Sequence, residues 1–175
     1  MKKILMFLAS DNFRDTEYLT PRAFFEQNNV NVMTISSQKI SRGRFGFIVK
    51  NDYLINDEID PAKFSGIFLV GGGGVLDYLE NRVLRKLVWD FSDSGKIIGA
   101  ICAAPRLLLK WGLLKNKKFT GWNGDGVLEK LGKENFAEYT NLSVQVDKNF
   151  VTGDGPNSVE ETALEFLKLI NGGGK

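Results

Sequence analysis

The stretch that decides the fold is residues 97–106, Ile97-Ile98-Gly99-Ala100-Ile101-Cys102-Ala103-Ala104-Pro105-Arg106. Its first five residues form a short apolar run without in/out alternation, which is typical of a strand buried on both faces. Residues 106–111 have helical spacing, and Pro105 is tolerated in the first turn of a helix. A strand that enters a helix through small residues around a single cysteine predicts a sharp nucleophile turn.

The rest of the chain alternates between short apolar runs and longer amphipathic ones. Further strands are expected at Ile4–Ala9, Val30–Ser36 and Ile67–Val70 and around Val144 and Phe150. Helices are expected at residues 17–28, 76–92 and about 158–170. This alternation predicts a single α/β domain with a mostly parallel sheet and helices on both faces.

Three local predictions can be checked against a structure. Leu19, Ala23 and Phe24 are expected on the buried face of the first helix. Residues 46–49 and 53–55, separated by Asn51-Asp52, are expected to form a hairpin. Ser158 and Glu161 are expected to form a capping box at the last helix.

The composition excludes many classes of site. The chain has 175 residues, no histidine, one cysteine and a formal charge of +2. Without histidine there is no Ser-His-Asp triad and no Cys-His dyad. One cysteine allows neither an internal disulfide nor a C-x-x-C pair, and it fits a reducing, cytoplasmic compartment. We expect no metal and no cofactor, since any metal site would need carboxylates alone. The nearly balanced charge also argues against a nucleic-acid partner.

The first residues do not predict a signal peptide or a membrane partner. The apolar run at residues 4–9 is too short for a signal sequence, and Asp11 and Arg14 follow it directly. No stretch approaches the roughly 18 apolar residues of a membrane span.

Cys102 has a chemical interpretation and a structural one. At a helix N-terminus the positive end of the dipole is expected to lower the pKa of the thiol, and nearby backbone N–H groups can hold an oxyanion. The alternative is that a lone cysteine serves as a small buried hydrophobic residue.

Gly71-Gly72-Gly73-Gly74 follows the expected strand at 67–70. Glycines at the carboxyl end of a parallel strand lie where open α/β sheets bind ligands. The run is not a dinucleotide fingerprint, because Leu76 stands where G-x-G-x-x-G needs its last glycine. A nucleotide-binding module and a plain tight turn both remain open.

Asp15 and Glu17 follow the first strand, near a helix start. Acids in the first turn commonly cap helices. Because parallel strands end at one edge of the sheet, Glu17 is also expected at the same edge as Cys102.

Five stretches, in this order, resemble the ThiJ/PfpI superfamily: Phe13-x-Asp15-x-Glu17-x-x-x-Pro21, Arg42-Gly43-x-x-Gly46-Phe47, the strand and glycines at 67–74, Ile101-Cys102-Ala103-Ala104-Pro105, and Thr152-Gly153-Asp154-Gly155-Pro156. The resemblance covers nearly the whole chain. It implies a flavodoxin-like sandwich over residues 1–170, a flexible tail at 171–175, and a homodimer or larger homo-oligomer.

The resemblance also implies roles for individual residues. Cys102 is the reactive residue and Glu17 lies beside its sulfur as acid and base. The N–H groups of Ala103 and of Gly72 or Gly73 hold an oxyanion. Further candidates for the pocket are Tyr18, Asp77, Trp122 and Asp154.

The sequence departs from the family at its histidines. Ala103 follows the cysteine where the peptidase-like branch has histidine, and residues 119–122 lack the histidine of the glyoxalase and redox-chaperone branch. A Cys-His-acid peptidase is therefore excluded. Two functions remain: a glyoxalase- or deglycase-like enzyme acting on a small carbonyl compound, and a non-enzymatic sensor or chaperone whose Cys102 is oxidised by peroxide.

Overall fold

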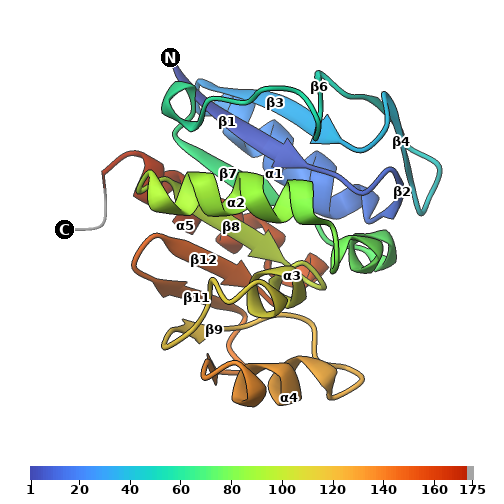
Figure 1. Ribbon diagram of the computed structural model, residues 1–175. Coiled ribbons are helices and arrows are strands. Elements are labelled where there is room, and N and C mark those ends of the chain that lie inside the picture. The colour runs from blue at the N-terminus through green and yellow to red at the C-terminus, as the bar shows by residue number, and fades with distance from the viewer. Residues whose placement is uncertain (173–175) are drawn as a thin grey trace.

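A computed structural model describes residues 1–172. They form one α/β domain in which a mostly parallel sheet lies between helices (Figure 1). Residues 173–175 of the predicted tail lie outside the described part of the chain.

The central sheet of these residues has seven strands in the order β11-β12-β8-β7-β1-β3-β6. Neighbouring strands are parallel, except that β11 runs antiparallel to β12. The strands in chain order are β1 (Lys2–Phe7), β3 (Val30–Ser36), β6 (Tyr53–Leu54), β7 (Gly66–Leu69), β8 (Ile97–Ile101), β11 (Val144–Asp147) and β12 (Phe150–Gly153). The predicted strands at 30–36 and 97–101 are thus confirmed, and the others are confirmed within a few residues.

Helices cover both faces of this sheet (Figure 1). On one face α1 (Asp15–Gln27) packs against α5 (Val159–Ile170), and α2 (Arg82–Asp93) lies over β7 and β8 on the other. The remaining helical elements are α3 (Pro105–Lys110), α4 (Val127–Glu134), η1 (Pro61–Lys63), η2 (Gly73–Tyr78) and η3 (Pro156–Ser158). Within residues 1–172, none of the helices has the length and apolar character needed to cross a bilayer.

The predicted hairpin is wrong. β5 (Ile48–Lys50) pairs antiparallel with β4 (Ile40–Gly43), and β4 pairs with β2 (Asp11–Phe13) in a small separate sheet. β6 instead joins the edge of the central sheet beside β3. A second small sheet pairs β9 (Lys118–Phe119) with β10 (Glu138–Tyr139).

Three helix predictions also need correction. Leu19 is 39% exposed and Ala23 is exposed, whereas Phe24 is partly buried against the core. Tyr18, Pro21 and Phe25 are the buried apolar residues of α1. The predicted helix at 76–92 is divided, because the Asn81 side chain caps a new helix by accepting the Leu84 N–H at 2.9 Å. No capping box forms at α5, since the Ser158 hydroxyl donates to the Gly155 carbonyl and the Glu161 carboxylate accepts from Ser143.

Aromatic rings fill the space between the sheet and the helices α1 and α5. Phe25, Phe68 and Phe166 meet with ring centroids 5.5–5.8 Å apart. Gly99 leaves room for this cluster, because a Cβ at that position would lie 2.5 Å from the Phe68 ring and 2.8 Å from the Phe166 ring. Close packing of this kind makes even one added methyl group costly.

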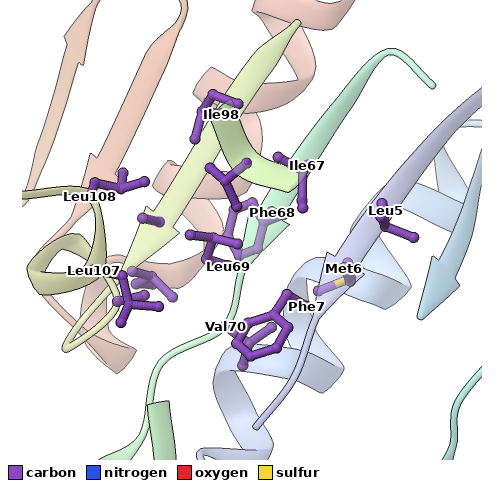
Figure 2. Packing of buried hydrophobic residues seen from close by; sticks show 14 of the residues in the cluster. Leu5, Met6, Phe7, Ile67, Phe68, Leu69, Val70, Ile98, Leu107 and Leu108 are labelled. Atoms are coloured by element: carbon purple, nitrogen blue, oxygen red, sulfur yellow. The ribbon is translucent and has the colours of Figure 1, made fainter. Parts of the chain in front are cut away.

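The strands that carry the site are fixed by the same core. Figure 2 shows side chains of β1, β7 and β8 packed together, with Leu107 and Leu108 of α3 beside the end of β8. Both leucines are fully buried. The helix that follows Cys102 is therefore anchored in the core, and the turn between strand and helix has little freedom to move.

Candidate active site

The cysteine turn is held by backbone hydrogen bonds on both sides. β8 ends at Ile101, and Cys102 has a φ of 59°, a left-handed conformation that is uncommon for a residue with a Cβ. Its N–H donates to the Gly153 carbonyl at 2.9 Å, and its carbonyl accepts the Trp122 N–H at 2.8 Å. Strained backbone of this type persists only where the surroundings enforce it, and it is concentrated at functional sites. Cys102 is left 8% exposed, and the turn has the geometry of a nucleophile elbow.

Glu17 lies beside Cys102 and is fully buried. It sits in the first turn of α1, which begins directly after β2. The Cys102 thiol and the Gly71 N–H face its carboxyl group, but neither carboxyl oxygen accepts a full hydrogen bond. The structure thus brings together the two residues that the sequence predicted as nucleophile and acid/base.

Gly71 makes this approach possible. A Cβ at Gly71 would overlap Oε2 of Glu17 and would lie 2.6 Å from the Ile101 carbonyl and 2.8 Å from Cβ of Cys102. The sequence alone did not point to Gly71 for this role. The signal that could have indicated this role is that Gly71 directly follows a strand, where a glycine allows another segment to approach the backbone closely.

Two backbone N–H groups point toward the sulfur. They belong to Gly72 and Ala103, and both favour the thiolate. Gly72 has a φ of 104°, and a Cβ there would lie 2.7 Å from the Asn12 carbonyl, so the turn requires glycine. Of the two glycines predicted as oxyanion donors, Gly72 faces the sulfur with its N–H and Gly73 only lines the pocket. That these N–H groups donate hydrogen bonds to an oxyanion stays a prediction.

Burial controls the protonation of the pair. It raises the pKa of the Glu17 carboxyl from 4.5 to about 7, and the thiol and Arg14 only partly offset this effect. Burial and the Glu17 charge together raise the pKa of the Cys102 thiol from 9.0 to about 12. The prediction that the helix N-terminus lowers this thiol pKa is therefore wrong, because burial of the thiol and the facing Glu17 carboxylate raise it.

The pair consequently loses its first proton near pH 7 and its second only in strong base. Above pH 7 one proton remains, with the carboxylate positioned to accept it from the thiol. A sulfur that attacks a substrate can pass its proton to Glu17 without solvent.

A pocket of about 350 Å³ opens above the cysteine. Its walls are formed by side chains and backbone from six segments of the chain: Arg14, Arg44, Gly72, Gly73, Leu76, Cys102, Ala103, Trp122 and Pro156. Trp122, a predicted pocket residue, is present and is 43% exposed.

The other predicted pocket residues do not line this pocket. Tyr18 lines a separate cavity with Arg22, Asp77 is exposed on η2, and Asp154 is outside the lining set. The neighbouring Tyr78 is buried, and its hydroxyl accepts the Ser10 N–H at 3.1 Å. It therefore serves local packing.

Two arginines at the pocket mouth were missed by the sequence analysis. Arg14 precedes α1, and its Nε lies 3.8 Å from Oε1 of Glu17. Arg44 lies in the loop between β4 and β5, far from Cys102 in the sequence. The loop is held because the Asp15 carboxylate accepts the N–H groups of Phe45 and Phe47, each at 2.9 Å. Asp15 therefore supports a loop and does not cap its helix.

In the described part of the chain, no group of three or more aspartate, glutamate or cysteine side chains is arranged to hold a metal ion.

The chain is similar to proteins of one known family. Residues 2–169 match the model of the DJ-1/PfpI family. The chain is 36% identical over 170 residues to an uncharacterized protein of Methanocaldococcus jannaschii, covering 96% of this chain and 82% of that one. It is 31% identical to protein/nucleic acid deglycase 2 of Escherichia coli, covering 97% of this chain and 99% of the other.

A third relative is deglycase PfpI of Pyrococcus furiosus, at 28% identity over 95% of this chain and 98% of that protein. Among solved structures, a ThiJ/PfpI domain protein from Brachyspira murdochii superposes with a TM-score of 0.91 at 24% identity. That superposition covers 97% of this chain and 96% of the other.

Proposed function

Because the chain belongs to the DJ-1/PfpI family, we propose that it is a cysteine-dependent enzyme that acts on small aldehydes or their glycated adducts. The observation that carries the proposal is the buried Glu17 carboxyl beside the thiol of a strained elbow cysteine. Relatives at about 30% identity that are named deglycases support the same chemistry.

The proposed reaction is the conversion of methylglyoxal and water to lactate. The Cys102 sulfur adds to the aldehyde carbon, and the carbonyl π bond becomes a hydroxyl group. The thiol proton passes to Glu17 and then to the new oxygen, while the N–H groups of Gly72 and Ala103 stabilise the negative charge.

With Glu17 as carrier, one proton then moves from the first carbon to the second, and the hydroxyl proton moves from the first oxygen to the second, which gives a lactoyl thioester. Water cleaves this thioester, and the thiol regains its proton. No electron acceptor is needed, because the substrate is oxidised at one carbon and reduced at the next. The missing histidine places all proton transfer on one carboxyl group.

The test is turnover of methylglyoxal by wild-type protein and two variants. Cys102→Ala removes the nucleophile and abolishes turnover. Glu17→Gln keeps the shape but removes the proton carrier, and turnover falls by about 10²–10⁴-fold. Glu160→Gln, an exposed carboxylate on α5, is the matched control and retains the wild-type rate. Equal rates in wild type and Glu17→Gln contradict the mechanism.

A redox function is the second candidate, and one observation favours it. Both Glu17 oxygens are buried without a hydrogen-bond partner, so they are free to accept the O–H of a sulfenic acid on Cys102. Peroxide would oxidise the thiolate to that acid and be reduced to water. Oxidation of Cys102 without any turnover of methylglyoxal selects this function over the enzyme.

The location and assembly of the protein are part of the same proposal. Both functions need a reduced thiol, which fits the cytoplasm. Exposed apolar side chains on α1 and the β4–β5 hairpin, namely Leu19, Ile40, Phe45, Phe47 and Ile48, favour a homo-oligomer. Light scattering of the purified protein distinguishes a monomer from a dimer or larger assembly.

A further inference from the structure

The mouth of the Cys102 pocket carries two positive charges and no negative one. Arg14 and Arg44 are its charged lining residues. The nearest acid, Glu17, lies behind the cysteine and is fully buried. Any molecule that reaches the sulfur therefore passes two guanidinium groups and meets no carboxylate on the pocket wall.

Neither arginine is neutralised by a close ion pair. Arg14 approaches Glu17 only to 3.8 Å, and its Nε is buried without a hydrogen-bond partner. Within residues 1–172, Arg44 has no carboxylate within ion-pair distance, and its guanidinium lies 5.8 Å from the Phe45 ring centroid. By contrast Arg106, which packs on Trp122 nearby, is paired with Asp125 at 2.6 Å.

The Arg44 position is built into the fold. Its backbone N–H donates to the Phe13 carbonyl at 2.8 Å, and the loop that follows is fixed by the Asp15 carboxylate. A Cβ at Gly43 would lie 2.6 Å from Cγ of Asp15. The absence of a side chain at Gly43 therefore lets this carboxylate approach the loop.

From this arrangement we propose that the pocket selects carbonyl compounds that carry their own oxyanion, a carboxylate or a phosphate. Guanidinium groups form paired, charge-assisted hydrogen bonds with both kinds of group. The oxyanion binds Arg14 and Arg44 and the carbonyl carbon faces the sulfur. Addition forms the S–C bond and breaks the carbonyl π bond, and the thiol proton reaches the new oxygen through Glu17. The proposal names the substrate class of the proposed enzyme and thus rests on the proposed function.

A pair of alkylating reagents tests the charge preference without requiring turnover. Iodoacetate carries a carboxylate and iodoacetamide is its neutral counterpart, and both react with the one cysteine of the chain. The rate ratio of the two reagents cancels the thiolate fraction, because both consume the same thiolate. The ratio for the folded protein is compared with that for N-acetylcysteine.

We expect the protein to favour iodoacetate by about fivefold more than N-acetylcysteine does, the effect of a partly exposed ion pair. Arg44→Gln and Arg14→Gln each lower this preference, and Arg42→Gln is the matched control. Arg42 is an exposed arginine of β4 that lies outside the pocket lining. Salt at about 1 M, where the screening length is about 3 Å, also removes the preference.

A wild-type ratio equal to that of N-acetylcysteine overturns the proposal, and so does an equal loss in Arg42→Gln and Arg44→Gln. If the wild-type protein prefers iodoacetate but does not turn over methylglyoxal, the proposed enzymatic function is wrong and the proposed charge preference stands. The two failures are thus distinguishable.

Protection of Cys102 from iodoacetamide identifies the oxyanion. Glyoxylate protecting at lower concentration than acetaldehyde indicates a carboxylate. Glyceraldehyde 3-phosphate protecting at lower concentration than glyceraldehyde indicates a phosphate. If neither anion protects better than its neutral partner, the substrate class is wrong.

Discussion

The floor and the mouth of the Cys102 pocket are built in different ways. The floor consists of a buried thiol, a buried carboxyl and backbone N–H groups, all fixed by strand ends and glycine contacts. The mouth consists of side chains from loops and short helical turns, two of them arginines. The rigid floor is suited to the chemical step, because reacting groups must be held within fractions of an ångström. The residues at the mouth select which molecules reach the sulfur, and substituting one of them is expected to reduce activity less than a substitution in the floor.

The largest effect is expected from filling the floor. In Gly71→Ala the new methyl group overlaps Oε2 of Glu17, and the carboxyl must move away from the thiol. A displacement of about 1 Å costs about 10²-fold in rate. Gly95→Ala is the control, because Gly95 is exposed, lies outside the pocket lining, and a methyl group there meets nothing within 4 Å. Methylglyoxal kinetics on both variants separate the two, and equal activity would show that the Glu17 approach is irrelevant.

The next effect concerns the pH dependence of stability. Folding raises the pKa of Glu17 from 4.5 to about 7, so the folded protein holds a proton that the unfolded chain has lost between these values. The free energy of unfolding therefore falls as pH rises through this window, by about 3 kcal/mol from this group. Glu17→Gln removes that decline. Urea unfolding across the window checks this, with Glu160→Gln as the exposed control; parallel curves for wild type and Glu17→Gln would refute it.

A smaller effect is expected at the mouth. Asp15→Asn leaves one of the Phe45 and Phe47 N–H groups without an acceptor, which costs about 1–3 kcal/mol. The loosened loop misplaces Arg44, so the preference for iodoacetate falls while alkylation by iodoacetamide is nearly unchanged. Asp93→Asn, at an exposed position on α2, should change neither value. A retained preference in Asp15→Asn would mean that the loop does not position Arg44.

The same division explains what the sequence could predict. The floor follows local rules: a buried strand, small residues and a helix signal around Cys102, glycines after the next strand, and Glu17 after the first. Because parallel strands end at one edge, these segments had to meet. The order of β8, β7 and β1 in the sheet brought them into contact.

The mouth depends on long-range contacts that no local pattern encodes. Arg44 lines the Cys102 pocket because the Phe13 carbonyl and the Asp15 carboxylate hold its loop. From the sequence, an acid in a first helical turn is expected to cap the helix. The hairpin prediction failed for a similar reason, since β5 pairs back onto β4 while β6 joins the central sheet. The buried face of α1 was misjudged because Tyr18 and Phe25, not Leu19, meet the core.

The most direct test of the Glu17–Cys102 pair is the rate of Cys102 alkylation by iodoacetamide as a function of pH, in wild type and Glu17→Gln. Burial and the Glu17 charge raise the pKa of the Cys102 thiol to about 12, so the wild-type rate should still rise with pH well above about 8.5, the value for an ordinary thiol. In Glu17→Gln the charge that disfavours the thiolate is gone while the thiol remains buried, so the midpoint should fall below that of wild type but stay above about 8.5. A wild-type midpoint near 8.5 that is unmoved in Glu17→Gln would contradict the coupling of these two residues.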